Sequence, residues 1–308
     1  ASAPEPVTAA AKPGRKVRRS AAHSSMWEEV RVLRRIRHPN VVSVQDVVEA
    51  QLSRPLKAAD MPSLWNELVA AGGLLPIDRA QVIFWQLCCG LAHCHGRKIA
   101  HRNIKPESIL LSASDHVKLT NFALATMIGT PCRDKCGTMP FVSPEVLAGA
   151  WYDPSASDIW ATGVLLVEML CGINKLPRMM KWSKASIVSA DRARDLANFF
   201  RAPRAMLENI SQDFGTLADG LDALLSGLLC VAPDERWTAM QARDSQWAAL
   251  GQARSPIVEQ APDGADEGSE GSVSDPDERR PDGDTGGTSE ERAGLPLHRE
   301  LEAPESPC

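Results

Sequence analysis

The most informative stretch of this sequence is HRNIKPESILL, residues 101–111. Its polar first half predicts a loop that positions side chains, and its apolar second half predicts a short strand. The segment HVKLTNFALA, residues 116–125, predicts a second strand that runs into a turn. Together they place amide, ammonium and hydroxyl groups on loops beside apolar strands, which is typical of a functional site.

Apolar residues at helical spacing predict helices on both sides of these two segments in the sequence. The residues DRAQVIFWQLCCGLAHCH, 78–95, place Ile83, Leu87 and Leu91 four residues apart and predict a long helix. The segment SDIWATGVLLVEMLCG, 157–172, is apolar on almost every side, which predicts a helix at the centre of a domain. Further helices are expected at SLWNELV (63–69), LADGLDALLSGLLC (217–230) and TAMQARDSQWAAL (238–250).

The front of the chain carries weaker signals. The segment WEEVRVLRRIR, residues 27–37, has apolar residues on one stripe and predicts a helix that Pro39 ends. The segment VVSVQDVV, residues 41–48, predicts a strand because it is rich in β-branched residues. Residues 1–25 predict no regular element.

Composition limits the class of protein. The 308 residues are 44% hydrophobic, which suffices for a substantial core, but from about residue 251 onward Asp, Glu, Gly, Ser and Pro dominate. We expect a disordered acidic tail there. The net charge of −5 therefore combines a basic N-terminal region with an acidic C-terminal one. No stacking aromatics accompany the basic residues, so nucleic-acid binding is not expected. No apolar run approaches the roughly 18 residues that cross a bilayer, so no membrane association is expected.

The eight cysteines form no paired CxxC framework, and most lie in apolar runs. This usage predicts reduced thiols in an intracellular protein, cytoplasmic or nuclear. Cys132 and Cys136 with His93 and His95 do not have the spacing of the common zinc sites.

Six motifs in one order resemble the eukaryotic protein kinase family, from about residue 28 to residue 250. These motifs match, in chain order, the family's αC helix, the catalytic loop HRDxKPxNxLL, the DFG turn, the activation segment, the central helix and an arginine-bearing turn near the end of the domain. The matching segments are EVRVLRRIRHPNVV (29–42), HRNIKPESILL (101–111), TNFA (120–123), CGTMPFVSPEVL (136–147), SDIWATGVLLVEMLCG (157–172) and APDERW (232–237).

This resemblance implies an α+β, bilobal protein-kinase-like fold with a truncated N-lobe and a mostly helical C-lobe. Residues 1–25 are expected to be a poorly structured basic lead-in, and possible N-lobe remnant. Residues 26–62 are expected to form a partial N-lobe with the αC helix and strands, residues 63–250 the helical C-lobe, and residues 251–308 the disordered tail. The Lys-Pro pair after Asn103, and Gly137-Thr138 before SPE (143–145), resemble the serine/threonine branch. The segment YDPSASDIWATGVLLVEMLCG, residues 152–172, is most similar to the calcium/calmodulin-dependent and AMP-activated types.

The resemblance also assigns structural positions. Glu145 and Arg236 are expected to form a buried ion pair that ties the activation segment to the helical body. Asp158 is expected to accept backbone hydrogen bonds from the catalytic loop. A spine of stacked side chains that joins the two lobes falls on Leu33, Val44, His101 and Phe122.

The catalytic positions depart from the family pattern. Asn103 stands where an Asp accepts the substrate hydroxyl proton, and loss of a general base costs roughly 10²–10⁴ in rate. Ser108 and Asn121 stand where an Asn and the DFG Asp hold Mg²⁺, and a metal that prefers anionic oxygens is weakened most by losing the carboxylate. Lys105 is retained, and it contacts either a phosphate or only solvent and the activation segment.

The nucleotide side departs as well. The sequence holds no GxGxxG loop before the first helix. The lysine that pairs with Glu29 in the family falls on Lys12, which has the more family-like separation, or on Lys16; the context is unlike the expected strand, and an ordinary surface lysine is the alternative for either. Leu110 falls at a nucleotide-contacting position. We therefore expect no cofactor, with ATP and Mg²⁺ as ligands only if nucleotide binding survives. The chain begins with Ala, so a missing upstream segment is an alternative explanation of this front.

Two functions remain open from the sequence. The first is a pseudokinase that acts as a scaffold or allosteric binding module, with protein partners bound through the helical lobe. The alternative is an active serine/threonine protein kinase that transfers the ATP γ-phosphate through an atypical site. The sequence predicts no oligomeric state.

Overall fold

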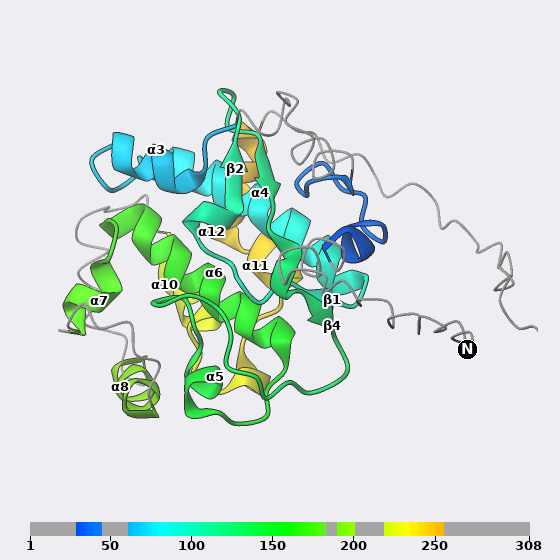
Figure 1. Ribbon diagram of the computed structural model, residues 1–308. Coiled ribbons are helices and arrows are strands. Elements are labelled where there is room, and N and C mark those ends of the chain that lie inside the picture. The colour runs from blue at the N-terminus through cyan, green and yellow to red at the C-terminus, as the bar shows by residue number, and fades with distance from the viewer. Residues whose placement is uncertain (1–28, 45–60, 181, 183–189, 201–218, 256–308) are drawn as a thin grey trace, which may run out of the picture. The chain divides into compact units, whose positions relative to one another are not determined.

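The computed structural model describes residues 29–44, 61–180, 182, 190–200 and 219–255. Within these ranges the protein is mostly helical and holds two small antiparallel sheets (Figure 1). The lead-in expected at 1–25, with Lys12, lies outside the described residues, as do residues 45–60 of the expected partial N-lobe and the tail from residue 256.

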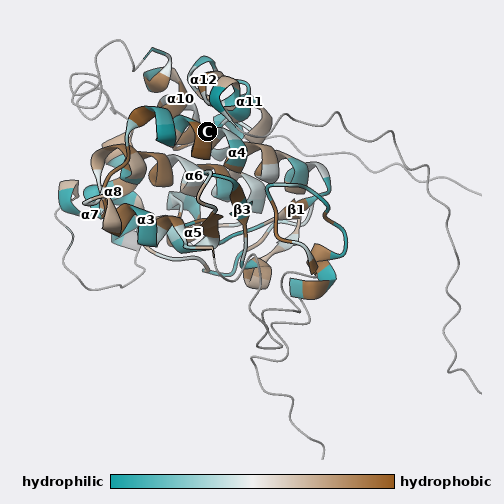
Figure 2. Ribbon diagram, turned by 90° about the horizontal axis from the view of Figure 1, so that it is seen from above, coloured by the Kyte–Doolittle hydropathy of each residue, from teal (hydrophilic) through white to brown (hydrophobic). Residues whose placement is uncertain are grey.

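Helix α6, Pro154–Cys171, is the centre of the hydrophobic core. Asp153 caps its N-terminus by accepting a hydrogen bond from the Ser155 N–H, and Gly172 ends it with a φ of 104°. From Asp158 to Leu170 every residue of α6 is buried, as its apolar sequence predicts. The helices around α6 carry hydrophilic as well as hydrophobic residues (Figure 2).

Helix α4, Ile77–Gly96, packs against α6 and against two short helices near the end of the described chain. These are α11, Ala239–Arg243, and α12, Gln246–Arg254. The segment 238–250 is thus two helices, because the Ser245 side chain caps a new one by accepting from the Ala248 N–H. Since α12 continues to Arg254 with Gly251 buried, the boundary expected at residue 251 falls inside a packed helix.

The sequence pattern predicts one of the two sheets, the pair at 109–111 and 117–119, and does not predict the strands at 99–100 and 126–127. Strand β2, Ile109–Leu111, pairs antiparallel with β3, Val117–Leu119. Strand β1, Ile99–Ala100, pairs antiparallel with β4, Thr126–Met127. The one-turn helices η1, Pro106–Ser108, and η2, Phe122–Leu124, adjoin β2 and β3.

The remaining elements complete the helical body. Helix α3, Leu64–Ala70, begins with a capping box between Ser63 and Asn66. The other elements are α5 (Pro144–Ala148), α7 (Lys175–Met179), α8 (Ala190–Phe200), α10 (Leu221–Leu228) and η4 (Pro233–Glu235). No helix in the described part of the chain is long and apolar enough to cross a membrane.

Two expectations for the front need correction. Residues 29–33 are helical and a turn follows at 34–35, so the helix ends before Arg37, as the restricted backbone before Pro39 favours. The strand expected at 41–48 is reduced to one bridge between Val41 and Leu119, residue 44 is helical, and residues 45–48 lie outside the described ranges. Val41 and Val42 are instead buried in the core.

Candidate active site

Asp158 on α6 holds the first two residues of the loop 101–108 by hydrogen bonds to their backbone. Its carboxylate accepts the backbone N–H of His101 at 2.7 Å and that of Arg102 at 2.6 Å, and it lies 2.9 Å from His95 Nε2. Arg102 has a φ of 63°, a left-handed conformation that costs energy in a residue other than glycine. The buried carboxylate supplies the charge-assisted hydrogen bonds that hold this backbone.

His101 joins the loop to the turn at Phe122. Its Nδ1 accepts the Asn103 N–H at 3.2 Å, so Nε2 carries the proton and donates to the Thr120 carbonyl at 2.8 Å. Complete burial lowers the pKa of His101 and keeps the ring neutral. The ring meets Phe122 edge to face at 4.7 Å, and Leu33 is buried in the same core. Val44, the fourth spine position, is half-buried against that core.

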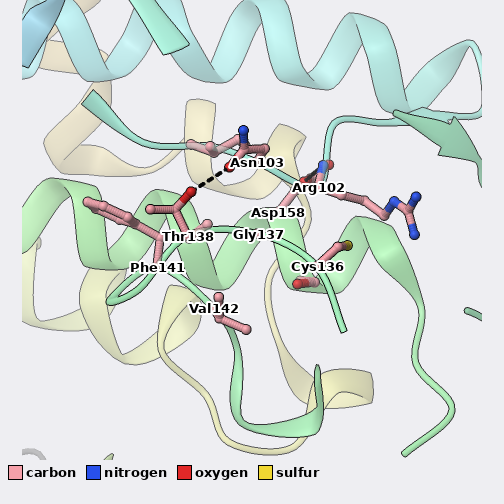
Figure 3. A pocket seen from close by; sticks show the side chains of 11 residues that line it. Arg102, Asn103, Cys136, Gly137, Thr138, Phe141, Val142 and Asp158 are labelled. Carbon is pink, nitrogen blue, oxygen red and sulfur yellow. Dashed lines mark hydrogen bonds between the residues drawn. The ribbon is translucent and has the colours of Figure 1, made fainter. Parts of the chain in front are cut away.

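Asn103 and Ser108 make their hydrogen bonds within the protein. Thr138 Oγ1 donates to Asn103 Oδ1 at 3.0 Å (Figure 3). Ser108 is fully buried, and its hydroxyl donates to the Asn103 carbonyl at 2.8 Å. The Ser108 hydroxyl proton therefore joins the two ends of the loop 103–108.

Asn121 adopts a left-handed conformation, with φ 67° and ψ 59°. Asparagine is among the few residues that tolerate this region, so the residue at this position fits the backbone of the turn. The next N–H, that of Phe122, donates to Glu29 Oε1 at 2.9 Å. Glu29 is thus bonded to the turn and is not a solvated carboxylate.

Lys105 immediately precedes η1, and Leu110 is the middle residue of β2. Lys105 is extended and partly exposed, and within the described ranges its ammonium group has no hydrogen-bond partner. Leu110 is half-buried, pairs with Lys118 across the β2–β3 sheet and packs against the core.

Arg102 connects the loop to the segment 124–138. Its Nε donates to the Leu124 carbonyl at 2.7 Å, and its Nη1 lies 2.7 Å from Asp134 Oδ2. The Tyr152 hydroxyl donates to the Asp134 carbonyl at 3.0 Å and fixes the same point. Sequence reasoning missed Asp134 and Tyr152, because no spacing rule connects them to the loop. It placed Thr138 in the activation segment but did not predict its hydrogen bond to Asn103.

Glu145 on α5 and Arg236 form a two-point ion pair, with N–O distances of 2.7 and 3.1 Å. The Arg236 side chain is completely buried, donates to the carbonyls of Cys230 and Ala156, and lies 5.3 Å from the centre of the Trp160 ring. All three nitrogens of this guanidinium group thus donate hydrogen bonds to protein oxygens.

A small hollow lies beside Asn103, lined by residues of the loop, the segment 136–142 and α6. Its free volume of about 10 Å³ has room for about one water molecule and none for a nucleotide. Among the described residues no three His, Cys, Asp or Glu side chains are grouped to hold a metal ion.

This arrangement of a loop, a turn, a central helix and a buried Glu–Arg pair agrees with comparison to known proteins. The chain belongs to the protein kinase domain family, whose model matches residues 5–248.

Curated relatives are serine/threonine kinases. The chain is 29% identical over 240 residues to the probable serine/threonine-protein kinase fhkE of Dictyostelium discoideum, covering 74% of this chain and 32% of that protein. It is 30% identical over 239 residues to CBL-interacting serine/threonine-protein kinase 12 of Arabidopsis thaliana, covering 75% and 45%. It is 28% identical over 226 residues to serine/threonine-protein kinase SIK2 of Gallus gallus, covering 72% and 26%. The chain thus spans less than half the length of each.

Proposed function

We propose that this chain is a pseudokinase, a kinase-like binding module with little or no phosphoryl transfer. The observation that carries the proposal is the pair of amides at Asn103 and Asn121, where the resemblance implies the base and the anionic metal ligand. Phosphoryl transfer depends on charge neutralisation by metal ions, and Mg²⁺ binds weakly without a carboxylate.

The state of Ser108 supports the same function. A hydroxyl at a metal position has to be reachable by the cation, and the Ser108 side chain is fully buried while its proton is donated to the Asn103 carbonyl. The structural contacts of Asp158, Glu145 and Arg236 need no nucleotide, so the fold is retained independently of chemistry. The partners expected are proteins bound through the helical lobe.

Thermal unfolding with and without Mg²⁺-ATP tests this function directly. We expect no significant rise in melting temperature, because binding stabilises the folded state only when the ligand is well above its Kd. A Mg²⁺-dependent rise of several degrees would count against the proposal.

One observation favours an active kinase as the second candidate. Glu29 bonds to the turn at Phe122, and Phe122 contacts His101, so the helix 29–33 is joined to the loop as a working site would require. Transfer of radiolabelled phosphate from ATP to a protein substrate decides between the two. Activity that disappears in Asn103→Ala and Lys105→Ala would establish the enzyme.

A further inference from the structure

Asn103 has a hydrogen-bond donor that is not used within the described part of the protein. Thr138 Oγ1 donates to its Oδ1 at 3.0 Å, and the amide nitrogen points away from Thr138 (Figure 3). Within the ranges that the structure describes, this nitrogen has no acceptor. The side chain therefore offers an NH₂ group at the position where the family resemblance implies a carboxylate oxygen.

Lys105 lies on the same side of the loop. Ile104 between them is buried, with 1% of its surface exposed, whereas Asn103 and Lys105 are both partly exposed. The chain thus alternates at these three residues, with the two polar side chains toward solvent. No described carboxylate pairs with the Lys105 ammonium group.

Two carboxylates near the loop are already hydrogen-bonded, whereas Glu107 is exposed and has no described bond to Lys105. Asp158 accepts the N–H groups of His101 and Arg102, and Glu29 accepts that of Phe122. Asn121 contributes no charge. The loop therefore presents an amide donor and an ammonium group, neither with an acceptor among the described residues, and such a pair of donors favours an anion.

We propose that this side of the loop binds the phosphate of a peptide phosphorylated on serine or threonine. The inference rests on the proposed function, since the resemblance places the hydroxyl of a protein substrate at residue 103. A phosphate monoester carries about −1.5 to −2 charges at neutral pH and offers only acceptor oxygens. Exchange of carboxylate for amide converts a group that would repel this phosphate into one that donates to it.

The test uses the full chain, without nucleotide, and fluorescein-labelled degenerate peptide pools followed by fluorescence anisotropy. The pools carry a central phosphoserine or phosphothreonine, the unmodified residue, or aspartate. We expect the phosphorylated pools to bind about tenfold or more tightly than the unmodified ones, because charge-assisted hydrogen bonds are the stronger ones. Equal affinities would overturn the proposal, and equal binding of the aspartate pool would make this a general acidic-peptide site instead.

Asn103→Asp is the sharpest variant, because it keeps the shape and the Thr138 hydrogen bond but replaces the donor by a charged acceptor. It should lose the preference for phosphorylated pools, and Lys105→Ala should weaken their binding. Asn103→Ala serves if the aspartate variant does not fold, and Lys175→Ala on α7 should bind as the parent does. An unchanged preference in a folded Asn103 variant contradicts the proposal.

A competition experiment with inorganic phosphate tests whether the peptide contributes to binding. Competition by free phosphate at the same concentration as the phosphorylated pool would identify a phosphate site and overturn the peptide assignment. Failure here is distinct from failure of the proposed function, because a chain inactive in phosphate transfer that also ignores phosphopeptides overturns only this inference.

Discussion

Arg236 and Glu145 meet across 91 residues of sequence, and both nitrogen–oxygen contacts of the pair are 3.1 Å or shorter. Arg236→Met should reduce the free energy of unfolding by about 3–5 kcal/mol, because it leaves the Glu145 carboxylate buried without its partner. Arg194→Ala is the matched control, since Arg194 and Asp191 are both largely exposed and an exposed pair contributes little. Chemical denaturation measures both. Equal stability of the two variants would show that the pair does not hold α5 to the body.

Asp158 provides a second prediction on the central helix. Asp158→Asn turns an NH₂ group toward one of the two backbone N–H groups that the carboxylate now accepts. A buried donor left without an acceptor costs about 1–3 kcal/mol, and more where a charged group made the bond. Hydrogen exchange at the amides of His101 and Arg102 should accelerate in this variant.

Asp153→Asn on the same helix is the control for that experiment. Asp153 caps α6 from an exposed position, and asparagine caps helices about as well as aspartate. We expect its stability and exchange rates to match those of the parent. If both variants lose protection equally, the loop does not depend on the Asp158 carboxylate.

Glu168 predicts a pH dependence of stability. Burial raises its pKa from 4.5 to about 7, although its Oε1 accepts the Asn174 N–H. The folded state thus holds a proton that the unfolded state releases, so this contribution to stability is present below pH 4.5 and is lost as the pH rises through about 7. The shift corresponds to about 3 kcal/mol.

Glu168→Gln removes this titration and keeps the Asn174 hydrogen bond. The variant should equal the parent in stability below pH 4.5 and exceed it above pH 7, by up to about 3 kcal/mol. Urea denaturation across this range measures the difference. Parallel curves for the two proteins would show that Glu168 is not the group responsible.

Gly251 predicts how closely α12 packs on α4. A Cβ at this residue would lie 2.1 Å from the Gln81 carbonyl oxygen, a backbone atom that cannot move aside easily. Gly251→Ala should cost about 1–3 kcal/mol by overpacking. Gly96→Ala, in the exposed end of α4 with nothing within 4 Å, should be neutral or stabilising by up to about 1 kcal/mol. Thermal melting of the two variants in opposite directions is the expected outcome.

Sequence periodicity predicted the helical body because the apolar residues that repeat at helical spacing are the ones that are buried there. The segment 157–172 is apolar on nearly every side and forms α6 at the core centre, and the four-residue repeat of 78–95 forms α4. The β-branched residues Val41 and Val42 misled the prediction, since they satisfy their burial in the core while only Val41 bridges to Leu119.

The candidate site was predictable only where contacts lie within motifs. Glu145 and Arg236 belong to recognisable segments, so their pairing was expected before the geometry was seen. The bonds from Glu29 to the Phe122 N–H and from Arg102 to Asp134 join segments with no common pattern. These pairings are determined by tertiary packing, and residue spacing within one segment does not predict them.

The left-handed backbone at Asn121 restricts which residues this turn accepts. Glycine, asparagine and aspartate enter that region most readily, and aspartate alone brings a charge. Aspartate and asparagine codons differ by one base, so a lineage can abandon or regain the acidic group in one mutational step without passing through a misfolded intermediate. At this turn, evolution of chemistry is decoupled from evolution of the scaffold.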